Sequence, residues 1–244
     1  MFDFCGANAG ANANLTLMKK DTFSSIWYKK YGSLPDVSEP LFIDLLRHRS
    51  VRQFTRQPVA EKKKRPLFAA AQSASSSANL QLWSAISVQS RKARNRIFKA
   101  SGNQLHVKNC AWFFVFLADH YRVAEAAKKQ GVNPWSLDLT EMYTMAVIDA
   151  ALAAERMACA AEVLGLGVCY IGGIRSNPAQ VKSILKLPQK TFALFGLCIG
   201  VPSKKAKGDI KPRLSQESVW SREIYNRSPD ILEYDKQSAK NYKE

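Results

Sequence analysis

The sequence has few of the residues from which metal sites and disulfide frameworks are built. Its 244 residues include five cysteines and three histidines. The cysteines are widely spaced and form no C-x-x-C pair, which disfavours both a disulfide framework and a zinc site. We therefore expect no bound metal, and the cysteine usage predicts a reducing, cytoplasmic location. The five cysteines are Cys5, Cys110, Cys159, Cys169 and Cys198.

The sequence also lacks an uninterrupted apolar run long enough to cross a bilayer. Its most apolar stretch, residues 142–168, contains Asp149, Glu155, Arg156 and Glu162, and charges are costly inside a membrane. The N-terminus does not combine a basic region with a following apolar one, as an export signal would. We expect a soluble protein with no membrane partner.

Acidic residues are scarce compared with basic ones. The chain has 36 Lys and Arg against 20 Asp and Glu, which gives a net charge of +16. Such an excess can indicate nucleic acid, an acidic surface, or an anionic cofactor and substrate. The basic clusters at residues 61–65, 91–96 and 204–207 are not interleaved with aromatic residues. We interpret them as solvated surface and expect no nucleic-acid partner; a nucleic-acid-binding protein is the less favoured alternative.

Hydrophobic patterning predicts one domain in which helices and strands mix along the chain. Residues 1–38 show no regular pattern and are expected to be an irregular leader with a short docking segment. The alanine-rich segment 138–164 predicts a long helix at the centre of the fold or at a subunit interface, ended by Gly165 and Gly167. The tail from residue 209 is expected to be polar, without a packed core of its own. Strands are predicted at residues 84–89, 112–118, 168–171 and 191–199, and further helices at 38–46, from Pro58 to about 74, at 92–101 and at 178–185.

Four polar or glycine-containing segments are candidates for a binding site. Each alone is common at helix ends or in turns. Their combination is more informative, because cations, hydroxyls and a strand end with exposed backbone amides suit an anionic ligand. They are His48-Arg49-Ser50-Val51-Arg52, the serine segment 74–81, Tyr170-Ile171-Gly172-Gly173 and Lys211-Pro212-Arg213.

With Gly102-Asn103-Gln104, Leu164-Gly165-Leu166-Gly167 and residues 197–202, these segments resemble the nitroreductase superfamily. The resemblance is to its NAD(P)H-dependent flavin reductases and oxygen-insensitive nitroreductases, and it runs from about residue 27 to 225. It implies an α+β fold: a mostly antiparallel sheet flanked by helices, in a domain-swapped homodimer with two FMN sites at the interface. The implied organisation is a leader and docking segment (1–38), an FMN-binding domain (39–208) with a lid at 120–137, and a C-terminal arm (209–244) around the partner subunit.

The resemblance also implies the residues that hold FMN. The dianionic phosphate would be bound by His48, Arg49, Ser50, Lys211 and Arg213, in keeping with its need for cations and hydroxyl donors. Arg52 would support the ring where negative charge develops on reduction. Ser75, Ser76, Ser77, Asn79 and Gln104 would hydrogen-bond the ring edge or the ribityl chain. Tyr170, Ile171, Gly172 and Gly173 complete the cofactor site, with the backbone N–H groups of the glycines near N5 and O4.

The implied activity is an FMN-dependent oxidoreductase. NADPH or NADH would give hydride to flavin N5, and a nitroaromatic, a quinone or free flavin would then accept electrons in the same space, which predicts ping-pong kinetics. No side chain is expected to act as a catalytic acid, base or nucleophile. A specialised flavoprotein of the same fold, such as a dehalogenase or a biosynthetic oxidase, is the alternative. Longer members of this family continue beyond the position of Glu244 with a basic segment that binds the NADPH 2′-phosphate. This sequence ends before that segment, so the resemblance implies no preference between NADPH and NADH.

Overall fold

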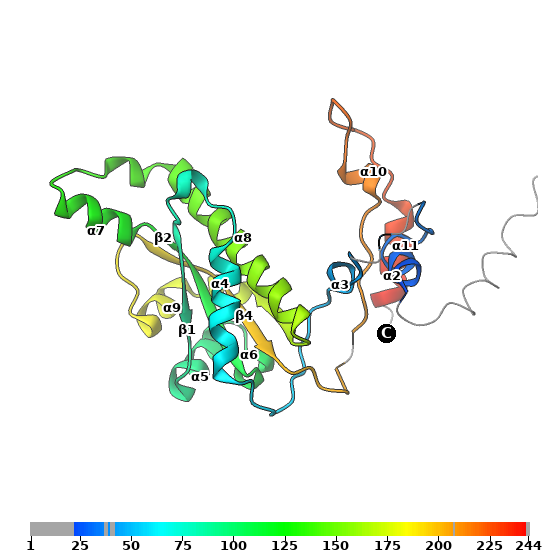
Figure 1. Cartoon of the computed structure of the whole chain (residues 1–244), viewed down its shortest axis with the longest axis horizontal. Coiled ribbons are helices and arrows are strands. Elements are labelled where there is room, and N and C mark those ends of the chain that lie inside the picture. Colours follow the sequence, from blue (N-terminus) through cyan, green and yellow to red (C-terminus); the bar gives the residue numbers. More distant parts are fainter. Residues whose placement is uncertain (1–21, 37–38, 40–41, 207, 243–244) are drawn as a thin grey trace, which may run out of the picture. The chain divides into compact units, whose positions relative to one another are not determined.

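The computed structural model describes residues 22–36, 39, 42–206 and 208–242 (Figure 1). The chain divides into two compact units. One is Ser50–Gly208, and the other combines the residues up to Arg49 with those from Asp209 onward. In the described residues, no helix is both long enough and apolar enough to span a membrane.

The Ser50–Gly208 unit is built on a four-stranded antiparallel sheet with the strand order β1-β2-β4-β3. Val115 in β2 lies opposite Ile86 in β1 and Gly196 in β4. The four predicted strands are confirmed to within two residues at each end, and with the flanking helices they confirm the α+β class. The strands are β1 (Trp83–Ser87), β2 (Trp112–Asp119), β3 (Gly167–Ile171) and β4 (Thr191–Gly200).

Helices cover both faces of this sheet. All eight residues of β2 are buried, because successive side chains point to opposite faces and both faces are packed. Phe114 and Phe116 pack with α4 (Lys64–Gln72) and the long helix α8 (Thr140–Val163). Phe113 and Val115 pack on the other side with α5 (Arg91–Ala100), α6 (Leu105–Asn109) and α9 (Pro178–Leu185). The core is therefore divided by the sheet into two layers.

The long helix α8 confirms the segment predicted at residues 138–164. Six of its alanines are completely or almost completely buried, so that the helix approaches the sheet closely. Gly165, with a φ of +73°, follows the end of the helix as predicted, whereas Gly167 already belongs to β3. A Cβ at Gly167 would lie 2.7 Å from the side chain of Val51, so its glycine is explained by packing.

The other predicted helices of this unit are present with shifted bounds. After Pro58 the chain first forms a 3₁₀ turn, η2 (Glu61–Lys63), before α4 begins. The excursion at residues 120–137 contains the expected short helix, α7 (Tyr121–Lys129), followed by the 3₁₀ turn η4 (Trp135–Asp138). Its hydrophobic residue Leu137 is buried, while Trp135 is exposed.

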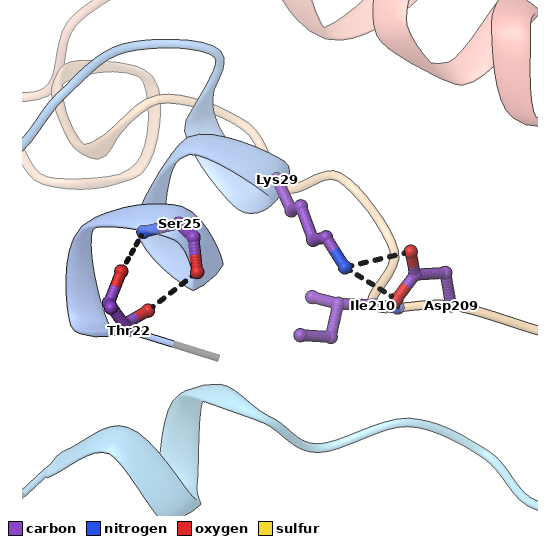
Figure 2. A network of polar contacts seen from close by, with 5 residues as sticks. All are labelled: Thr22, Ser25, Lys29, Asp209 and Ile210. Atoms are coloured by element: carbon purple, nitrogen blue, oxygen red, sulfur yellow. Dashed lines mark hydrogen bonds and ion pairs between the residues drawn. The ribbon is translucent and has the colours of Figure 1, made fainter. Parts of the chain in front are cut away.

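The unit formed by the two chain ends corrects the prediction that residues 1–38 are irregular. Residues 23–31 form helix α2 (Phe23–Tyr31), whose buried face includes Phe23 and Ile26. Thr22 caps its start by accepting a hydrogen bond from the backbone N–H of Ser25 (Figure 2). Gly32, with a φ of +74°, ends the helix. Both capping signals are visible in the sequence, whereas the prediction for residues 1–38 was an irregular leader with a short docking segment. Residues 1–21 lie outside the described part of the chain.

Three further helices belong to this unit. The helix expected at residues 38–46 is described only as α3 (Ile43–Leu46), since residues 38, 40 and 41 lie outside the described part. The polar tail contains α10 (Gln216–Val219) and α11 (Leu232–Tyr242). The ammonium of Lys29 on α2 is 3.0 Å from the carboxylate of Asp209 (Figure 2), which ties the N-terminal segment to the tail.

Candidate functional site

A buried carboxylate organises the serine segment. Asp149 lies within α8, is 1% exposed, and accepts three hydrogen bonds, two from this segment and one from the residue that follows it. The donors are the hydroxyl of Ser76 at 2.7 Å and the backbone N–H groups of Ser77 at 2.9 Å and Leu82 at 3.0 Å. These bonds compensate the buried charge for its lost hydration. Sequence reasoning missed this role and treated Asp149 only as a charge within an apolar run, although an aspartate at helical spacing from Ala146 and Ala153 was an available signal.

The backbone of the serine segment is strained. Three of its residues adopt left-handed conformations that are costly without glycine: Ala78 (φ 48°), Asn79 (φ 54°) and Gln81 (φ 51°). Arg122 on α7 holds the far end of the segment by donating to the carbonyl oxygens of Gln81 at 2.6 Å and Trp83 at 2.7 Å. Asp149 thus accepts hydrogen bonds from the hydroxyl and backbone N–H groups of the loop, while Arg122 donates to backbone carbonyl oxygens where the loop meets β1.

These contacts decide which polar side chains the segment offers to a ligand. The hydroxyl of Ser76 donates to Asp149 and accepts from the backbone N–H of Gln81 at 2.8 Å. Ser76 therefore shapes the loop through its side chain. Ser75 and Asn79 are exposed and Ser77 is half-buried, so their side chains are better placed to meet a ligand.

The two glycines after β3 differ in their surroundings. A Cβ at Gly173 would collide with the carbonyl oxygen of Ser101 and lie 2.8 Å from Nε2 of Gln104. At Gly172 a Cβ would meet only the guanidinium of Arg175, at 3.4 Å. Glycine at position 173 is thus required by packing within the unit, whereas the exposed Gly172 leaves its backbone accessible to a ligand.

Gln104 and Arg52 are both close to His106. The amide nitrogen of Gln104 donates to the carbonyl oxygen of Ser101 at 2.9 Å, and its Oε1 lies 3.1 Å from Nε2 of His106. Burial and then the positive charge of Arg52 lower the pKa of His106, so the imidazole is largely neutral at pH 7. The fold therefore gathers Arg52, Gln104 and Gly173, with His106 as a neighbour that the sequence motifs did not reveal.

The other residues at the end of β3 are largely committed to protein contacts. The Tyr170 hydroxyl donates to Oε2 of Glu155 on α8 at 3.0 Å. Burial, followed by the charge of Glu155 and this hydrogen bond, raises the pKa of Tyr170 well above its usual value. Ile171 is completely buried in the core. Any direct contact between Ile171 and a ligand would have to use its backbone.

The predicted phosphate residues fall mainly in the unit of the two chain ends. Arg49 has a buried guanidinium nitrogen, Nη1, without a hydrogen-bond partner among the described residues. Arg213 and Lys211 lie on the segment that follows Asp209, and the backbone N–H of Arg213 donates to the carbonyl oxygen of Lys30 at 2.8 Å. Ser50 begins the other unit, where it bridges to Val168 in β3, and His48 is half-buried.

Asp209 provides the acidic counterpart of this basic segment. Burial alone would raise the pKa of Asp209, but three groups outweigh it. The backbone N–H of Ile210, the ammonium of Lys29 and the guanidinium of Arg49 together lower that pKa. Asp209 therefore stays ionised and compensates part of the charge of Arg49 and Lys29.

The chemistry of the two sets of residues fits a flavin mononucleotide. Buried donors without a partner commonly indicate a ligand or ion, and Arg49 Nη1 is such a donor next to a basic segment. The serine segment and Gly172 supply hydroxyl, amide and backbone donors of the kind that bind a ribityl chain and a ring edge. In the described ranges, no group of three His, Cys, Asp or Glu side chains could hold a metal ion.

Comparison with known proteins supports this interpretation. The model of a family described as the nitroreductase family matches residues 45–201. The chain is 38% identical over 206 residues to the FMN reductase (NADPH) of Bacillus subtilis, with 82% of each chain covered. It is 40% identical over 200 residues to the oxygen-insensitive NADPH nitroreductase of Salmonella typhimurium, covering 80% of this chain and 79% of that protein.

The fold is likewise similar to solved structures. One is the NADPH:FMN oxidoreductase from Vibrio harveyi complexed with NAD⁺, with a TM-score of 0.76 and 35% sequence identity. The match covers 82% of this chain and 85% of that one. The similarity thus extends over most of both proteins.

Proposed function

Because this chain belongs to the nitroreductase family, we propose that it is an FMN-dependent oxidoreductase that uses NADPH or NADH to reduce small electron acceptors. The observation that carries the proposal is the similarity, over about four fifths of the chain, to relatives named for FMN and NADPH. The acceptors are nitroaromatics, quinones or free flavin. When bound, FMN supplies the hydride chemistry, taking hydride at N5 and passing electrons on.

The residues of this chain would bind and orient the cofactor. Arg49, Lys211 and Arg213, with His48 and Ser50, would hold the phosphate. Charge-assisted hydrogen bonds to a dianion are strong, and a guanidinium can offer two parallel donors. Because Arg49 has a buried donor that no described residue satisfies, it has the clearest structural support in this group.

The serine segment and the end of β3 would bind the remainder of the flavin. Ser75, Ser77 and Asn79 would offer side-chain donors and acceptors, while Ser76 acts through the loop that it closes. The Gln104 amide is already oriented by Ser101 and His106, so it would meet the ligand in a fixed position. Gly172 and Gly173, with Tyr170 and Ile171, would contribute mainly backbone groups.

Arg52 would stabilise negative charge on the ring. Its guanidinium is exposed, yet close enough to influence the titration of His106 and Cys169. A fixed cation favours the more negatively charged state of a neighbouring group without reorganisation. The neutral imidazole of His106 adds no competing positive charge.

The active protein would be a homodimer, with the partner covering the outer face of α8. Ile148 is 47% exposed, Leu152 44% and Val163 71%, although they lie on a helix whose opposite face is packed on the sheet. They are 4, 11 and 15 residues apart, which are helical spacings, so that they share a side of the helix. The domain swap, the C-terminal arm around the partner and the cytoplasmic location belong to the same proposal.

The test begins with the colour of the purified protein. We expect a yellow protein whose flavin absorbance is bleached by NADPH or NADH without oxygen, and stopped-flow rates with the two nucleotides give the preference. A panel of nitroaromatics, quinones and free flavin then identifies the acceptor. A colourless protein that binds no added FMN contradicts the proposal, whereas bound flavin with no turnover of the panel favours a specialised flavoprotein.

A further inference from the structure

Lys30, on helix α2, is a largely buried residue whose positive charge has no acidic partner among the described residues. Lys30 is only 6% exposed, and its side chain makes no hydrogen bond or ion pair with any described residue. The neighbouring Lys29 behaves in the ordinary way, since its side chain is 45% exposed and pairs with Asp209. Most of the Lys30 residue is buried while its ammonium has no anion beside it, which is unfavourable because a charge loses hydration near a protein interior. The position of Lys30 therefore needs an explanation.

A second cation lies next to Lys30. The two residues are joined through the backbone, where the N–H of Arg213 donates to the carbonyl oxygen of Lys30. Burial, and then the charge of Arg213, lower the pKa of Lys30. No carboxylate in the described part of the chain raises this pKa, so the positive charges of Lys30 and Arg213 repel each other when no anion is bound.

Both cations line one hollow of about 570 Å³, which lies wholly within the unit of the two chain ends. None of the described residues that line it is acidic, and Tyr31 and Tyr234 are among them. A bound anion would remove the repulsion between Lys30 and Arg213 and would give the ammonium its missing partner. The hollow is large enough for a phosphate group with part of the molecule that carries it.

We propose that Lys30 and Arg213 form a binding site for a phosphate monoester dianion carried by a nucleotide. The site rests on the proposed function, which supplies two such groups: the phosphate of FMN and the 2′-phosphate of NADPH. Their shared chemistry is a compact dianion that is best bound by two cations and neutral donors. Lys30 precedes the family match, which begins at residue 45, so the family model assigns it no role.

The experiment compares ligands with and without the phosphate. Dissociation constants of FMN and riboflavin are measured with the apoprotein, and those of NADPH and NADH with the flavin-loaded protein. In Lys30→Met, we expect binding of FMN or of NADPH to weaken about 10-fold or more, while its phosphate-free counterpart is unchanged. The affected pair identifies the source of the phosphate.

Two other variants separate a specific contact from a general effect. Lys30→Arg should restore most of the affinity because it keeps the charge, and Lys29→Met should leave the difference between the paired ligands unchanged, although it removes the same net charge. If Lys30→Met does not fold, the same dissociation constants are measured with Lys30→Gln, which removes the charge but keeps a polar side chain. If Lys30→Met weakens both ligands of each pair equally, or weakens none of them, this site is overturned, even though the wild type still binds FMN. A wild type that binds no FMN overturns the proposed function itself.

Discussion

At the scale of single residues, the role of Asp149 follows from its two hydrogen bonds to the serine segment and a third to the following Leu82. These bonds hold a backbone that contains three left-handed residues without glycine. Such strain persists only where the surroundings enforce it. We therefore regard Asp149 as a positioning residue for the side chains of the serine segment.

Asp149→Asn should destabilise the apoprotein by about 3 kcal/mol, because an amide cannot accept from all three buried donors. FMN binding should weaken as the serine segment loses its conformation. Urea unfolding of the apoprotein and FMN titration measure the two effects. Asp138→Asn, which removes a largely exposed ion pair with Lys190, is the control and should cost less than about 1 kcal/mol. Unchanged stability and affinity in Asp149→Asn would rule out this role.

Two adjacent glycines allow a matched comparison at the residue scale. Gly173→Ala should destabilise the apoprotein by about 1–3 kcal/mol, since its methyl group would push against Ser101 and Gln104. Gly172→Ala has space in the apoprotein and should leave its stability nearly unchanged, but should weaken FMN binding if the flavin lies against this backbone. Thermal unfolding and FMN titration of both variants check the prediction. It fails if the two substitutions have the same effect on stability.

At the scale of elements, the segments with uniformly apolar or uniformly small residues predicted the structure best. The continuously apolar segment at residues 112–118 and the alanine-rich one at 138–164 became β2 and α8, because each is long and its burial is uniform. Helix α2 was missed, although Thr22 and Gly32 are ordinary caps. Its aromatic and lysine residues gave no clear apolar stripe, and among the described residues its partners are α3 and the tail of the same unit, both of which are separated from it in the sequence.

At the scale of the whole molecule, the exposed apolar face of α8 predicts a dimer. In a symmetric dimer each subunit would bury one such carboxylate at the interface, so that one substitution buries two charges. Leu152→Glu should therefore weaken the dimer at least about 100-fold, which corresponds to about 3 kcal/mol. Analytical ultracentrifugation over a range of concentrations measures the change.

The control for this prediction is Val132→Glu, at a residue that is 58% exposed on the excursion between α7 and η4. It introduces the same charge away from α8 and should leave the dimer intact. A wild type that is monomeric at micromolar concentration, or a Leu152→Glu variant that dimerises like the wild type, would refute α8 as the interface.

The sequence by itself determined the strands and the long helix, because these depend on local periodicity. Motifs that are contiguous in the chain indicated the family and, through that resemblance, the α+β fold class. The sequence also indicated the cations and hydroxyls expected around a flavin, whose roles stay predictions. Only the tertiary structure showed that Ser76, unlike its neighbours, is bonded through its side chain to a buried carboxylate. It alone also showed that Gly173 is crowded while Gly172 is not, and that Lys30 is buried while Lys29 is not. These distinctions depend on partners far away in the sequence: Asp149 on α8, Ser101 and Gln104 after α5, and Arg213 in the tail. Burial and pairing are properties of such distant contacts, which the local pattern of residues does not contain.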